Sequence, residues 1–137
     1  MDPSDNPSVP AMPAPWSRRA GWALTIAAAA LLVFSGTMKL TNSSEMIEGF
    51  EKIQWPPSLA IPIGIVEIVS ALLYVLPRTA VLGAVLLTGY MGGAIATHAR
   101  LLEPVFAQAA IGVAIWLGLY LRDRRLRALL PLVRRAV

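Results

Sequence analysis

The sequence predicts an all-α integral membrane protein built as a four-helix bundle. Hydrophobic residues make up 56% of its 137 residues, and the mean hydropathy of +0.62 is too high for a soluble domain of this size. Apolar windows long enough to cross a hydrocarbon core, which needs about 20 helical residues, are present. They cover roughly residues 20–38, 58–76, 80–98 and 104–121. Their length fits helices, because membrane β-strands are shorter and alternate in polarity.

Basic residues at the ends of these windows predict that both termini lie in the cytoplasm. Nine flank one side, namely Arg18, Arg19, Arg78, Arg122, Arg124, Arg125, Arg127, Arg134 and Arg135. Three flank the other side, namely Lys39, Lys52 and Arg100. Because Lys and Arg concentrate on the cytoplasmic side, we expect a multi-pass protein of the cell inner membrane whose main partner is the lipid bilayer. This topology also explains the pI near 10.1, so nucleic acid is not an expected partner.

The regions outside the transmembrane domain, residues 18–121, differ from it in composition. Residues 1–17 begin "MDPSDNPSVPAMPAP" and are rich in proline, which predicts a disordered cytoplasmic tail. Residues 122–137 place leucines among arginines, which predicts a basic amphipathic tail at the cytoplasmic lipid surface. The chain has no cysteine, which excludes iron–sulfur clusters and thiolate zinc sites held by this chain.

The first external loop, "KLTNSSEMIEGFEKIQWPP", has a helical period of its own. Met46, Ile47, Phe50 and Ile53 share one face, and acidic residues lie largely opposite them. We therefore expect a short amphipathic helix in this loop. Two interpretations stay open: the helix anchors the protein at the membrane interface, or it forms a lid over a pocket.

Glu67 is the strongest functional candidate in the chain. It is the only acidic or basic residue between Lys52 and Arg78, within the apolar run "IPIGIVEIVSALLYVLP". A charge at membrane depth costs about 2.5 to 3.5 kcal/mol on insertion scales, so such residues usually face a partner, the bundle interior or a cavity. At about nine residues into its helix, Glu67 is expected close to the bilayer midplane.

Other polar groups are expected to face the same external pocket. Lys39 is the expected countercharge of Glu67, although it lies nearer the external surface by one or two helical turns, and His98 is expected near the mouth. The remaining candidate ligand-binding residues are Ser35, Tyr90, Arg100 and Gln108. The alternative is that a neutral Glu67 is only hydrogen-bonded to a neighbouring helix and that Lys39 and Arg100 extend to the interface. No metal site is expected.

Four stretches of the chain together resemble the DoxX-like family of small four-helix bacterial membrane proteins. They are "FSGTMKL", "GFEKIQWPP", "GIVEIVSALLYVLPRTAVLGAVLLTGYMGGAIATHARL" and "LGLYLRDRRLRALLP", across about residues 21–131. The resemblance implies recurring positions at Ser35, Gly36, Lys39, Gly64, Glu67, Gly92 and His98. It also implies a connection to quinone, because the family takes its name from the membrane subunit of a thiosulfate:quinone oxidoreductase.

Three functions from different classes are compatible with these features. The first is a non-catalytic subunit or small-molecule binder, with quinone as the candidate ligand, associated with a membrane redox system through a partner protein or a homo-oligomer. The second is a membrane oxidoreductase that passes electrons to quinone, which the residues disfavour because the chain offers one histidine and no cysteine to hold a redox cofactor. The third is an assembly factor or carrier for another membrane protein.

Overall fold

The computed structural model describes residues 15–130, and within that range it contains helices and no strand. In chain order the elements are α1 (Pro15–Leu40), α2 (Ser44–Lys52), the short 3₁₀ helix η2 (Pro57–Leu59), α3 (Ala60–Val75), α4 (Ala80–Arg100), α5 (Phe106–Arg122) and α6 (Arg124–Leu129). Most of the predicted disordered tail and the last seven residues lie outside the described part. Residues 15–17, which the sequence analysis placed in that tail, instead begin α1, because proline suits the first turn of a helix.

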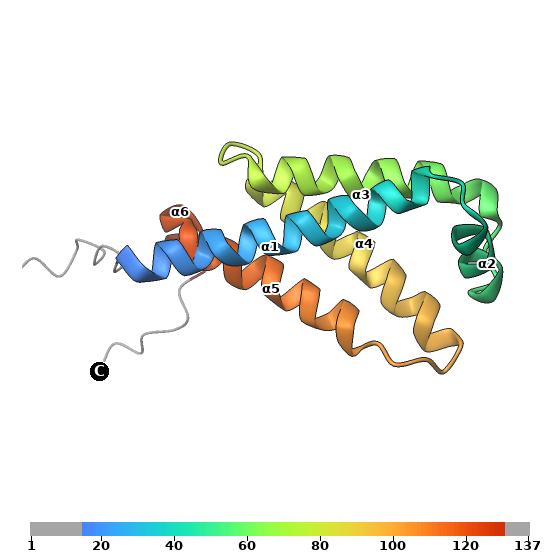
Figure 1. Ribbon diagram of the computed structural model, residues 1–137. Coiled ribbons are helices and arrows are strands. Elements are labelled where there is room, and N and C mark those ends of the chain that lie inside the picture. Colours follow the sequence, from blue (N-terminus) through green and yellow to red (C-terminus); the bar gives the residue numbers. More distant parts are fainter. Residues whose placement is uncertain (1–14, 131–137) are drawn as a thin grey trace, which may run out of the picture.

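The four long helices form a ring in which each packs against two neighbours. Helix α1 lies between α3 and α5, and α4 closes the ring by packing against α3 and α5. The start of α1, the α3–α4 turn and the end of α5 lie together, at what we call the terminal end (Figure 1). Helix α2 and the α4–α5 connection lie at the opposite, loop end. Toward the loop end, α4 and α5 diverge from α1 and α3 (Figure 1).

The bundle exposes many large apolar side chains on its outer surface, while its core includes several alanines. Phe34 is 66% exposed and Val113 is 67% exposed, whereas Ala71 and Ala84 are fully buried. A continuous apolar surface of this kind is unfavourable in water but matches a lipid environment. Helices α1, η2–α3 and α4 are long and apolar enough to cross a membrane by length and composition. Helix α5 is apolar but has 17 residues, fewer than the predicted fourth span, because it begins at Phe106, after Pro104.

Glycines set the distances between helices at two crossings. A Cβ on Gly64 of α3 would lie 2.8 Å from the carbonyl oxygen of Gly36 of α1. A Cβ on Gly83 of α4 would lie 2.2 Å from the backbone nitrogen of Tyr74 of α3. The backbones of α1 and α3, and those of α3 and α4, are therefore in contact, as small residues allow in membrane bundles.

Tyr74 and Arg122 join three helices at the terminal end. The Tyr74 hydroxyl donates to the Ile115 carbonyl at 2.8 Å and lies 3.3 Å from Thr25 Oγ1. The Arg122 guanidinium donates to the carbonyls of Tyr74 and Val75 and lies over the Trp22 ring at 4.5 Å. These carbonyls belong to the last turn of α3, so Arg122 caps that helix end and complements its dipole.

Candidate functional site: a cavity with one polar wall

An ion pair between α1 and α3 is the most buried charged group in the described chain. Lys39 Nζ lies 2.8 Å from Glu67 Oε2, and the Glu67 side chain is only 2% exposed. Lys39 Nζ also donates to Ser35 Oγ at 2.7 Å, one turn earlier on α1. The structure therefore pairs Lys39 with Glu67 as the sequence predicts, and Ser35 holds the lysine in place.

The depth difference between Lys39 and Glu67 is closed by side-chain direction and by the glycine crossing. Side chains on a helix point toward its N-terminus, so Lys39 extends back along α1 and deeper into the bundle. The contact between Gly36 and Gly64, one turn from each charge, brings the two backbones close enough for the ammonium to reach the carboxylate.

The ion pair forms part of the wall of a cavity of about 510 Å³. This volume lies within the range of about 300–1,000 Å³ that is typical of small-molecule sites. Most of the wall is apolar, with Leu32, Ile63, Met91 and Ile111 contributed by the four long helices. The cavity thus combines a large apolar surface with one charged region, as expected for a site that binds an amphipathic molecule.

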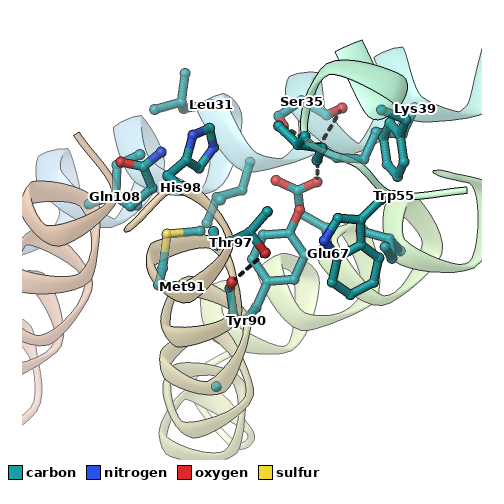
Figure 2. Close-up of a pocket in the computed structure, with 18 residues that line it drawn as sticks. Leu31, Ser35, Lys39, Trp55, Glu67, Tyr90, Met91, Thr97, His98 and Gln108 are labelled. Atoms are coloured by element: carbon teal, nitrogen blue, oxygen red, sulfur yellow. Dashed lines mark hydrogen bonds and ion pairs between the residues drawn. The ribbon is translucent and has the colours of Figure 1, made fainter. Parts of the chain in front are cut away.

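Tyr90 completes the polar wall from α4. Its side chain points toward the Glu67 carboxylate, on the side away from Lys39 (Figure 2). The carboxylate therefore lies between an ammonium group from α1 and a phenol from α4. A ligand oxygen that enters this region meets two donors, Lys39 and Tyr90, and one acceptor, Glu67.

His98 and Gln108 also line the cavity, away from the ion pair. Figure 2 draws both of them at the left of the view, whereas Lys39 lies at the right. His98 Nδ1 lies 2.7 Å from Glu103 Oε2 in the α4–α5 connection, so its partner is Glu103 and not Glu67. The carbonyl oxygen of Gln108 is buried and has no hydrogen-bond partner within the described chain.

Arg100 is the one predicted site residue that does not line the cavity. Its guanidinium donates to the Ile53 carbonyl at 3.0 Å, just after α2. A few residues further along α4 and its connection, Glu103 forms a 3.7 Å ion pair with Lys52 of α2. Arg100 and Glu103 thus fasten the α2 segment to the end of α4.

The α2 segment closes part of the loop end of the cavity with aromatic and aliphatic side chains. Phe50 of α2, together with Ile53 and Trp55 that follow it, lines the cavity. Ser43 caps α2 by accepting from the Met46 N–H at 3.3 Å. The lid interpretation stays a prediction, and the contact of this segment with the cavity is compatible with it.

Glu103 is expected to make the stability of the fold depend on pH. The hydrogen bond from His98 and, to a lesser degree, the charge of Lys52 hold the pKa of Glu103 below its usual value of 4.5. A lowered pKa means that ionised Glu103 stabilises the fold at pH above 4.5 and that this contribution is lost as the pH falls through the lowered pKa. We expect the difference in melting temperature between wild type and Glu103→Gln to be largest near neutral pH and to shrink on acidification.

Thermal unfolding in detergent over a pH series would measure this difference. Glu48→Gln provides a matched control, because Glu48 is an exposed carboxylate on α2 itself. A constant difference between wild type and Glu103→Gln from neutral to acidic pH would contradict the assignment.

The apolar residues that line the cavity could not be predicted from the sequence. Ile63, Met91 and Trp55 have the same apolar character as residues that face lipid, so periodicity does not separate the two sets. Trp55 offered one signal, since it follows the amphipathic stretch and immediately precedes two prolines.

Comparison with known families adds an independent observation. Residues 23–121 match the model of the DoxX-like family, and this range includes most of α1 and α5, all of α3 and α4, and the residues that line the cavity. The chain belongs to the DoxX-like family. No curated protein and no solved structure matches it. Family membership supports the helical membrane fold of this DoxX-like chain, and its function has to be argued from the cavity.

Proposed function

We propose that this DoxX-like protein is a non-catalytic membrane subunit that binds a small amphipathic molecule in the cavity between its four long helices. The observation that carries the proposal is the buried pair of Lys39 and Glu67 in the wall of a mostly apolar cavity. Burying a charge pair costs desolvation energy, and a pair of apolar side chains usually packs helices together without that cost. A ligand with a polar head gives such a pair a use.

A quinone is the ligand that fits this wall best in our proposal. Its ring carbonyls are acceptors, and Lys39 and Tyr90 are the donors at the polar wall. On reduction its oxygens become hydroxyl donors, and Glu67 is then a suitable acceptor. The apolar ring would lie against residues such as Leu32 and Ile111. Electrons would be exchanged with a separate redox partner protein.

The proposed orientation places the cavity in the external half of the bacterial inner membrane. Arg18, Arg19, Arg78 and Arg122 all belong to the terminal end, which makes that end cytoplasmic under the distribution rule for basic residues. The α2 segment then lies at the external interface, and α5 crosses with the other three helices.

Mass spectrometry of small molecules extracted from the detergent-purified protein tests the proposal. Wild type is expected to carry an amphiphile, such as a quinone, that Glu67→Gln loses. Ser70→Ala is the matched control, because Ser70 is a buried polar residue one turn away on α3 that does not line the cavity. Empty extracts from wild type, or equal extracts from wild type and a folded Glu67→Gln protein, would contradict the proposal.

A further inference from the structure

A second apolar hollow lies outside the bundle, along α5. This groove has a volume of about 710 Å³, and its lining includes Ile95 of α4, Gly112 and Trp116 of α5, and Leu126 of α6. Between Gln108 and Tyr120 it follows α5 for about 18 Å, at 1.5 Å per residue. It begins at the cavity and runs toward the terminal end.

Gln108 is the point where the cavity and the groove meet. Its side chain lines both of them. Neighbouring residues divide between the two spaces, since Ile111 faces the cavity and Gly112 faces the groove. The buried, unpartnered carbonyl oxygen of Gln108 lies at this junction. Because buried polar atoms are nearly always hydrogen-bonded, this atom is positioned to accept from a group that passes between the two spaces.

The groove is open on its α5 side at Gly112. A Cβ added to Gly112, which lines the groove, would meet nothing within 4 Å, while one turn further along α5 Trp116 Nε1 donates to Thr88 Oγ1 of α4 at 2.8 Å. This differs from Gly64 and Gly83, where a Cβ would touch the backbone of the next helix. Gly112 therefore leaves space beside α5 instead of drawing two helices together.

We infer that the seam between α4 and α5 is a lateral entrance from the bilayer, and that the ligand of the cavity has a long apolar tail that occupies the groove along α5. The polar head passes Gln108 to reach Lys39 and Glu67. We infer an apolar tail because the cavity and the groove are continuous. The groove would give this tail van der Waals contacts over most of the length of α5. This inference rests on the proposed function and adds the route of entry and the second half of the ligand.

Photocrosslinking from the tail tests the route. The probe is decylubiquinone with a diazirine at the end of its tail, added to the full chain in detergent, and the crosslinked residues are identified by mass spectrometry. Crosslinks are expected on the groove-facing residues of α5 and α6. They are expected to disappear with excess unlabelled decylubiquinone and in Glu67→Gln, because the head holds the tail in place.

A substitution in the groove gives a second readout. Gly112→Leu fills space that is open in the structure and is expected to lose most of the groove crosslinks. Ala110→Leu, on an exposed part of the same helix that lines neither space, is expected to keep them. Unchanged crosslinks in Gly112→Leu would overturn the groove assignment.

Failure of the lateral entrance and failure of the proposed function would give different crosslinking results. Crosslinks that depend on Glu67 and on competition but fall on the outer faces of α1 or α3 would overturn the lateral entrance and leave the proposed function standing. Crosslinks that neither compete nor depend on Glu67 would overturn both, because the quinone head would then not occupy the cavity.

Discussion

Replacing Lys39 by Met is expected to lower the free energy of unfolding by about 3–5 kcal/mol, the usual cost of leaving one member of a buried ion pair without its partner. The Glu67 side chain is 2% exposed, so its carboxylate has little water to replace the lost ammonium. Glu67→Leu is expected to cost less, because Lys39 is 19% exposed and keeps its hydrogen bond to Ser35. Chemical unfolding in detergent, followed by circular dichroism, would measure both effects.

The double variant Lys39→Met/Glu67→Leu is expected to recover most of this loss. Replacing both charges with apolar side chains removes the desolvation cost together with the attraction, so the net change is often small. The double-mutant cycle then gives a coupling energy of several kcal/mol between the two positions. Additive losses in the double variant would show that the two side chains do not interact.

Gly83→Ala is expected to be the most damaging single-methyl change in the bundle. The new Cβ would lie 2.2 Å from Tyr74 N and 2.5 Å from Tyr74 Cα, and these are backbone atoms that have no side-chain freedom. Overpacking typically costs about 1–3 kcal/mol, and we expect the upper end of that range or more here, because α3 and α4 must separate. Separation would also disturb the carbonyls that Arg122 caps.

Gly92→Ala is the control for this substitution. Gly92 lies on the same helix, and a Cβ there would meet nothing within 4 Å. Because alanine favours a helix by about 1 kcal/mol over glycine, this variant is expected to match or exceed wild type in stability. Equal melting temperatures for Gly83→Ala and Gly92→Ala would contradict the close α3–α4 contact.

The helices could be predicted from the sequence because membrane thickness fixes their length. The apolar runs were sufficient for the helical class, and the isolation of Glu67 was sufficient to name it as the leading candidate. The pairing of Lys39 with Glu67 was also predicted, but its geometry was not. That geometry depends on the contact between Gly36 and Gly64, which brings two helices together through backbone atoms and leaves no mark in the hydrophobic pattern.

Other parts of the site were beyond sequence reasoning for a physical reason. Arg100 and Glu103 act on the α2 segment, and such contacts between loops depend on how the helices are arranged. The start of α1 at Pro15 was missed because a proline-rich composition predicts disorder, although proline is compatible with a first helical turn. The open seam beside Gly112 has the same sequence character as a packed glycine contact.

The most direct test of the central claim is the amount of co-purified amphiphile carried by the double variant Lys39→Met/Glu67→Leu, measured by mass spectrometry per mole of folded protein. Stability and binding are separated in this variant, because it is expected to keep the fold while the polar wall loses its charges. We predict a folded protein that has lost the amphiphile carried by wild type. A folded double variant that retains as much amphiphile as wild type would contradict the account and would leave the ion pair as a packing element only.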